Sequence, residues 1–144
     1  MTLLLIEHGA FVLAQDKDEC TPLHISALHG RSNVARILLE RGADVSAKNK
    51  EGETPLHIAA DERMAALLIE HRADASAKDK GGGTPLHNAA TDGFKRLARL
   101  LLEHGAEVDA QNDTGGTPLL FAARHGDEAV RSLTRRALDL KAVN

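Results

Sequence analysis

A three-residue motif, Thr-Pro-Leu, occurs four times along the chain, and its spacing limits the folds that are available. The copies begin at Thr21, Thr54, Thr84 and Thr117, at spacings of 33, 30 and 33 residues. A regular period of about 20 to 50 residues is typical of folds that stack one small unit on the next. We therefore expect a linear array of similar units and no single large core.

The residues at each motif predict a first short helix. Thr is a favoured N-cap, and Pro is tolerated in the first helical turn because its missing N–H would be unpaired there anyway. A short helix is therefore expected at every Thr-Pro, including Thr54-Pro55. Small pairs such as Ala89-Ala90 follow on the inner face. They allow a neighbouring helix to lie close.

A second helix and two kinds of turn follow in each unit. Val34, Ile37 and Leu38 show the i, i+3, i+4 spacing of an amphipathic helix. Glycine precedes this helix, and a further glycine stands where a helix ends in a left-handed residue. The first group is Gly30, Gly93 and Gly126, and the second is Gly42 and Gly105. Tight turns are expected later in each unit, at 49–52, 79–82 and 112–115.

Composition supports a layered fold and excludes several classes of protein. The chain has 42% apolar and 27% charged residues, which is too apolar for a disordered segment. With three Phe and no Tyr or Trp, small aliphatic residues must fill the interior. A net charge of −3 argues against nucleic acid and anionic membranes as partners. The N-terminal apolar run 3–6 is too short for a signal peptide or a membrane span.

Helix, turn, helix and extended hairpin turn, with T-P-L-H and a period of 33, resemble the ankyrin family over nearly the whole chain. The resemblance implies an all-α ankyrin-repeat solenoid, a single array over 1–144 of stacked helix-turn-helix units joined by hairpin turns. About four and a half repeats are expected. They are a half repeat at 1–15, a repeat at 16–48, a shortened repeat at 49–78, a repeat at 79–111 and a C-terminal capping repeat at 112–144.

The repeat at 49–78 departs from the pattern in two ways. It is three residues short, and alignment places the deletion between Ala60 and Met64, which should leave a dent in the helical wall. It also has Arg72 where its siblings have Gly42 and Gly105. A non-glycine residue forced into the left-handed region costs about 1 kcal/mol. We expect this repeat to be the least stable of the array.

The two ends of the array differ. Thr134 and Arg135 replace a leucine pair, and Leu138-Asp139 replaces the closing Gly-Ala. Polar residues on an outer face are what a capping repeat needs, so Thr134 and Arg135 are expected to face solvent. At the other end, Leu4, Leu5 and Ile6 predict an apolar edge. The chain is expected to be part of a longer array, with self-association through this edge as the alternative.

No catalytic, metal or cofactor site is predicted, so we do not expect an enzyme. All eight histidines have repeat positions: His24, His57 and His87 in T-P-L-H, and the others near helix ends at His8, His29, His71, His104 and His125. The resemblance implies that the T-P-L-H histidines are structural. Cys20 and His24 lack an orienting third group, so an exposed thiol is expected. Gly81-Gly82-Gly83-Thr84 lacks the lysine of a phosphate loop.

The resemblance places binding at the hairpin tips and at the exposed edge of the helical wall, which line a concave groove. The candidates at the hairpins are Lys17, Asp18, Cys20, Lys48, Lys50, Glu51, Glu53, Lys78, Lys80, Asp113 and Thr114. Those at the helix edge are Leu28, His29, Asp61, Glu62, Thr91, Asp92, Arg124 and His125. Because Trp and Tyr are absent, a polar interface of moderate affinity is expected.

The leading functional hypothesis is a non-catalytic module that binds a partner protein. The alternatives are a structural spacer in a longer ankyrin array and a regulatory domain of a larger protein. A basic cluster near the C-terminus, at Arg124, Arg131, Arg135, Arg136 and Lys141, could meet an acidic partner or simply be a solvated cap. With one cysteine and no leader segment, an intracellular, cytoplasmic location is expected.

Overall fold

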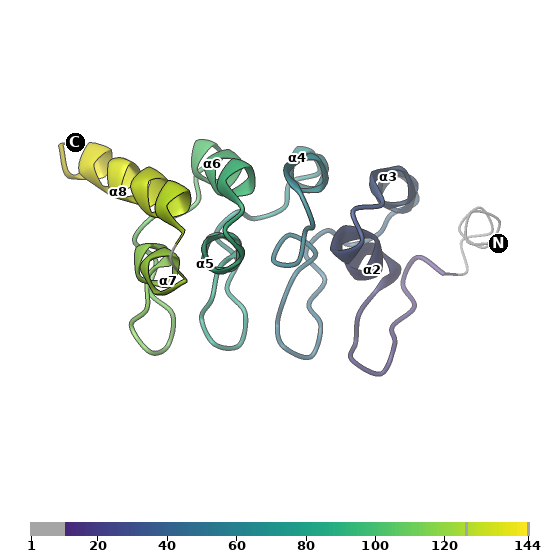
Figure 1. Cartoon of the computed structure of the whole chain (residues 1–144). Coiled ribbons are helices and arrows are strands. Elements are labelled where there is room, and N and C mark those ends of the chain that lie inside the picture. The colour runs from purple at the N-terminus through teal and green to yellow at the C-terminus, as the bar shows by residue number, and fades with distance from the viewer. Residues whose placement is uncertain (1–10, 126, 144) are drawn as a thin grey trace. The chain divides into compact units, whose positions relative to one another are not determined.

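A computed structural model describes residues 11–125 and 127–143, and among these residues it contains helices and loops but no β-strand. The chain divides into two compact units, Met1–Asp74 and Ala75–Asn144. The first contains α2 (Pro22–Leu28), α3 (Ser32–Glu40) and α4 (Glu62–Glu70). The second contains α5 (Pro85–Asp92), α6 (Lys95–Glu103), α7 (Pro118–Arg124) and α8 (Glu128–Val143) (Figure 1).

In the first unit, α2 packs against α3 and α3 against α4. The start of α2 is fixed by Thr21, whose hydroxyl accepts the amide of His24 at 3.4 Å. Leu23, Ala27 and Leu38 are fully buried between the helices. The predicted helix start at Thr-Pro is therefore confirmed at Thr21, as it is at Thr84 and Thr117 in the second unit.

The predicted helix at Thr54-Pro55 is wrong. Residues 55–58 form successive turns, with bonds from the His57 amide to the Thr54 carbonyl at 3.0 Å and from the Ile58 amide to the Pro55 carbonyl at 3.3 Å. Figure 1 shows a loop beneath α4 at this position, whereas in the preceding repeat a helix, α2, lies beneath α3. Because of the deletion, α4 begins at Glu62, which leaves too few residues for a helix and a turn. The Ala60 amide bonds to the Ala27 carbonyl instead, at 3.0 Å.

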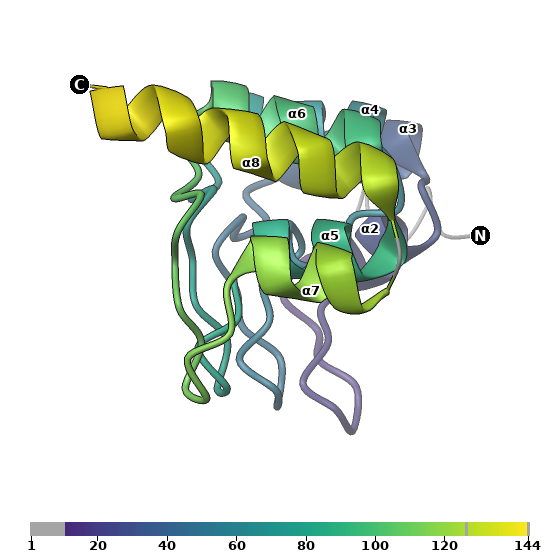
Figure 2. The same cartoon turned by 60° about the vertical axis from the view of Figure 1, so that its left-hand side comes forward.

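In the second unit, the helices form two layers (Figure 2). α5 packs on α7 in one layer and α6 packs on α8 in the other. Leu86, Ala90, Ala98 and Leu101 are fully buried. The small alanines thus allow the close approach that the sequence predicted.

Several residues adopt the left-handed backbone conformation. Gly42 and Gly105 do so, with φ of 91° and 89°, and Arg72 does so with φ of 71°, which confirms the prediction at the three helix ends. Glu19 is a further case, with φ of 63°. It stands at the hairpin position that Gly52 occupies in the next repeat, and the sequence analysis missed it.

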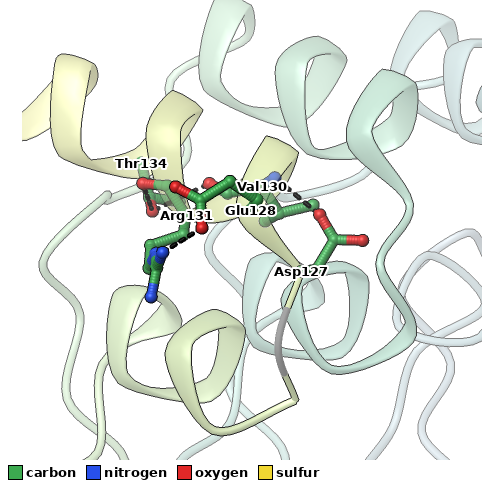
Figure 3. Close-up of polar contacts among 5 residues, drawn as sticks. All are labelled: Asp127, Glu128, Val130, Arg131 and Thr134. Carbon is green, nitrogen blue, oxygen red and sulfur yellow. Dashed lines mark hydrogen bonds and ion pairs between the residues drawn. The ribbon is translucent and has the colours of Figure 1, made fainter.

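The last helix, α8, is built differently from the other second helices (Figure 3). The Asp127 carboxylate accepts the Val130 amide at 2.7 Å and caps its start, while Glu128 pairs with Arg131. With Leu138 in place of the terminating glycine, α8 continues to Val143. Its end is held by Lys141, whose Nζ lies 2.7 Å from the Asp109 carboxylate.

The prediction that Thr134 faces solvent is wrong. Thr134 is fully buried at the position of Leu101 in the preceding repeat. Its hydroxyl lies 3.0 Å from the carbonyls of Val130 and Arg131, within its own helix, so no polar atom is left unpaired (Figure 3). Arg135 is exposed, as predicted.

Some sequence predictions fall outside the described residues. These are the apolar edge at Leu4, Leu5 and Ile6, the helix-end position of His8 and the turn at Gly126.

Candidate partner-binding surface

Four hairpin loops, here called fingers, share one internal arrangement. They comprise residues 16–20, 49–53, 79–83 and 112–116. The first residue of each is Asp or Asn, and its side-chain oxygen accepts two amides of the same loop. In the third finger, Asp79 accepts from Gly81 at 2.9 Å and from Gly83 at 2.8 Å. The loop backbone is therefore satisfied internally, which fixes the shape of each finger.

Adjacent fingers within a unit are joined by single backbone bonds. The Lys50 amide donates to the Asp18 carbonyl at 2.9 Å in the first unit. In the second, the Asp113 amide donates to the Gly81 carbonyl, also at 2.9 Å. This backbone bond aligns the two neighbouring tips but does not pair them as β-strands. The side chains of each tip therefore remain directed to solvent.

The T-P-L-H histidines connect the helices to the fingers. In His87, Nδ1 accepts the Thr84 amide at 3.1 Å, so the ring proton lies on Nε2, which donates to the Gly116 carbonyl of the next finger at 2.9 Å. His24 repeats this arrangement with Thr21 and the Glu53 carbonyl. The structural role implied for these histidines, within and between repeats, is therefore confirmed for His24 and His87.

The environment of His87 favours the neutral ring. Burial lowers its pKa, although the Gly116 carbonyl acts in the opposite direction. The ring of Phe121 meets it edge-on, with centroids 5.3 Å apart. Since both ring nitrogens already have partners, His87 is unsuited to proton transfer.

Histidines at helix ends have a different, local role. His29 lies with Nδ1 2.9 Å from the Ile25 carbonyl, and His71 with Nδ1 3.0 Å from that of Leu67. Each ring therefore adds a second bond to a carbonyl near the helix end that already accepts the amide of the same histidine.

In the first unit, the finger candidates divide into tip residues and residues held at the base. Lys17, Asp18, Lys50 and Glu51 are exposed at the tips, and Lys48 is exposed just before the second finger. The Glu53 carboxylate is held by Asn49 Nδ2 at 3.0 Å. Lys17, Asp18, Lys50 and Glu51 are therefore available to a partner, whereas Glu53 is partly used within its own finger.

Cys20 is half-buried, so the expectation of an exposed thiol is wrong. Asn49 Nδ2 lies 3.8 Å from its sulfur. Burial raises the pKa of the thiol, and the nearby carboxylates, of which Asp16 is one, raise it further. The His24 ring bonds to Thr21 and to the Glu53 carbonyl, so no nucleophile and base pair forms.

The helix-edge candidates of the first unit are only partly free. Leu28 and His29 are exposed at the end of α2. The Asp61 carboxylate caps α4 by accepting the Met64 amide at 2.8 Å, and Glu62 is half-buried. Ile25 is 39% exposed and Leu28 52%, one turn apart on α2. This edge is therefore apolar where a polar surface was expected; the i, i+3 spacing was the signal that could have indicated it.

The candidates of the second unit are mostly exposed. Those with an exposed side chain are Lys78, Lys80, Thr91, Asp92, Asp113, Thr114, Arg124 and His125. The Thr91 hydroxyl donates to the His87 carbonyl and that of Thr114 to Asn112 Oδ1, both at 2.9 Å. Lys80 and Asp113 remain at the tips of adjacent fingers and offer opposite charges.

The family model described as ankyrin repeats (3 copies) matches residues 1–79 and again residues 61–144. The chain belongs to the ankyrin repeat family. Ankyrin repeats are generally protein–protein interaction modules and are typically non-catalytic. The fold class inferred from the sequence is thus shown, and a comparison with curated proteins gives no match.

Two further observations concern this ankyrin chain's chemistry. Within residues 11–125 and 127–143, no group of three His, Cys, Asp or Glu side chains is placed to hold a metal ion. None of the described helices has the length and apolar character needed to cross a bilayer.

Sequence reasoning missed the exposed apolar residue at the T-P-L-H position of the last ankyrin repeat. Leu120 takes the place of the T-P-L-H histidine and is 58% exposed, whereas His87 is 3% exposed. The change from T-P-L-H to T-P-L-L was visible in the sequence. It removes the side chain that would bond to a following finger.

Proposed function

We propose that this ankyrin array is a non-catalytic module that binds a partner protein through the tips of its fingers and the exposed edge of its first helices. The observation that carries the proposal is the internal bonding of the fingers. Because the side-chain and backbone bonds at their bases fix the loops, the tips are preorganised, and little conformational entropy is lost when a partner binds. An intracellular, cytoplasmic location fits the single cysteine, Cys20, which has no second cysteine in the chain.

The tips give the proposed surface its charge. Lys17, Lys50 and Lys80 occupy the same position in three successive fingers, directly after the Asp or Asn that closes the loop. All three are exposed, and the fourth finger has Asp113 there. A partner that contacts the adjacent fingers of the second unit would place an acidic group opposite Lys80 and a basic group opposite Asp113.

On the helix edge, Ile25 and Leu28 supply the apolar contact that the tips lack. An interface needs buried apolar side chains as well as charge, because exposed ion pairs contribute only about 0–1 kcal/mol each. The expected interface therefore combines charged finger tips with the small apolar strip on α2.

Affinity capture from the native source tests this proposal. The wild-type array is compared with Lys50→Glu/Lys80→Glu, and Arg36→Glu/Arg41→Glu serves as the control because these exposed residues change the charge equally on a different part of the chain. Circular dichroism verifies folding. We expect a specific protein with the wild type and the control that is reduced at least about tenfold with the finger variant. Equal recovery with all three would refute the finger assignment.

A further inference from the structure

A groove lies between α6 and α8 in the second unit, away from the fingers. It consists of two adjoining hollows, with volumes of about 620 and 370 Å³. Arg99, Leu133 and Arg136 line both hollows, which makes them one continuous groove. Arg99 comes from α6, and the other two come from α8.

The groove arises where this chain departs from its own repeat. In α6 the chain leaves the helix at Gly105, but in α8 the corresponding residue is Leu138, so the helix continues beyond that point. Figure 2 shows α8 extending past the end of α6. The extension supplies Leu140 and Lys141 to the wall of the larger hollow. The bond from Lys141 to Asp109 holds that wall in place.

The floor of the groove is apolar and accessible. Leu102 and Leu133 are half-buried within it. Leu140 is 67% exposed at its rim. An apolar side chain from a partner could therefore enter between the two helices and remove these leucines from water.

The smaller hollow is basic, although the chain as a whole carries a net charge of −3. The larger hollow has mixed charge: Arg99, Arg136 and Lys141 line it together with Glu103 and Glu107, and Lys141 pairs with Asp109. Lys95, Arg99 and Arg136 line the smaller hollow, and none of their side chains forms an ion pair or hydrogen bond with another residue in the described part of the chain. Glu128, the acidic residue of that hollow, pairs with Arg131.

We propose that this groove is a second docking surface, which takes an acidic segment of a partner protein that carries an apolar anchor. The anchor packs on Leu133, and carboxylates on either side of it bind Arg99 and Arg136. Arginine binds a carboxylate through two parallel hydrogen bonds and retains its charge when it is partly buried. The like charges that face one another across the groove repel in the free protein, and an acidic partner relieves that repulsion.

Peptide selection on the whole chain tests this proposal. Short peptides that combine Asp and Glu with Leu, Ile, Met or Phe are displayed together with two matched libraries, in which the acidic residues are replaced by Ser or the apolar ones by Gly. Binding of the enriched peptides is then measured on the wild type, on Arg99→Glu/Arg136→Glu and on the control Arg36→Glu/Arg41→Glu. Circular dichroism confirms that each variant is folded.

We expect enrichment from the acidic apolar library alone. The selected peptides should bind Arg99→Glu/Arg136→Glu at least about tenfold more weakly than the control, and their binding to the wild type should weaken with added salt. Equal loss in both variants, or selection of peptides that bind through Lys50 and Lys80, would overturn the proposal. So would equal enrichment from the libraries without acidic or without apolar residues. Capture of a partner at the fingers is measured separately, so either proposal can fail alone.

Discussion

Replacing Arg72 by glycine should stabilise the protein. Arg72 ends α4 with φ of 71°, in the left-handed region that its siblings Gly42 and Gly105 occupy without strain. An L-residue there costs about 1–2 kcal/mol. Relief of this strain is partly offset, by about 0.4–1 kcal/mol, because glycine increases the conformational entropy of the unfolded chain. The net gain expected for Arg72→Gly is therefore about 1 kcal/mol.

Two further variants separate the backbone effect from the side chain. Arg72 is exposed, and Arg72→Ala removes its side chain but keeps the strained backbone, so its stability should stay within about 0.5 kcal/mol of the wild type. Gly105→Ala introduces the strain where it is absent now. A Cβ there would have no atom within 4 Å, so its cost of about 1 kcal/mol is purely conformational.

Urea unfolding followed by far-ultraviolet circular dichroism measures these differences, since the chain has neither Trp nor Tyr for fluorescence. For Arg72→Gly, the midpoint should rise with no change in the slope m, and Tm should increase by about 2–4 °C. If Arg72→Gly is no more stable than Arg72→Ala, left-handed strain is not what distinguishes this repeat.

Three further predictions concern stability, helix content and reactivity. Burial holds the pKa of His87 below its ordinary value of 6.5, so the unfolded chain binds a proton first and stability falls as the pH drops below 6.5. In urea unfolding, His87→Leu should flatten the dependence of the free energy of unfolding on pH. If that dependence is unchanged in His87→Leu, it does not come from His87. Inserting Thr-Asp-Gly after Ala60 restores the repeat length, so 55–58 should become helical and the dichroism at 222 nm should strengthen. Because its thiol pKa is raised, Cys20 should react with iodoacetamide more slowly than a free thiol at neutral pH. Asp18→Asn should accelerate the reaction, because the Asp18 carboxylate is one cause of the raised pKa. A rate unaffected by Asp18→Asn would show that this carboxylate does not influence the thiol.

The regular parts of the fold were predictable because each rests on local chemistry. At Thr21, Thr84 and Thr117 the Thr-Pro pair fixes a helix start, and at Gly42 and Gly105 glycine fixes a left-handed end. The deletion was placed in the turn between Ala60 and Met64, with a dent in the helical wall as its consequence, but the loss of the helix at 55–58 was not predicted. At Thr54-Pro55 the local signal for a helix is intact, and the helix is absent because the chain must reach Asp61 within a few residues. A constraint of chain length therefore overrode a local preference.

The candidate surface was less predictable because it depends on which groups already have partners. The sequence predicts Asp61 as a free carboxylate on the binding edge, but in the structure this carboxylate accepts the Met64 amide and caps α4. Thr134 is polar, yet its hydroxyl bonds within its own helix and the side chain is buried. The groove between α6 and α8 also required the structure, since it depends on how far α8 continues beyond Leu138.

Hydrogen exchange of the array with its captured partner tests the proposed finger surface most directly. Exchange of the amides in each finger is compared between the free and bound protein, with α3 and α4 as internal references. We expect slower exchange at 16–20, 49–53, 79–83 and 112–116, together with the exposed edge of α2. A stable complex in which exchange at the fingers is unchanged would contradict the proposal that this ankyrin array recognises its partner through them.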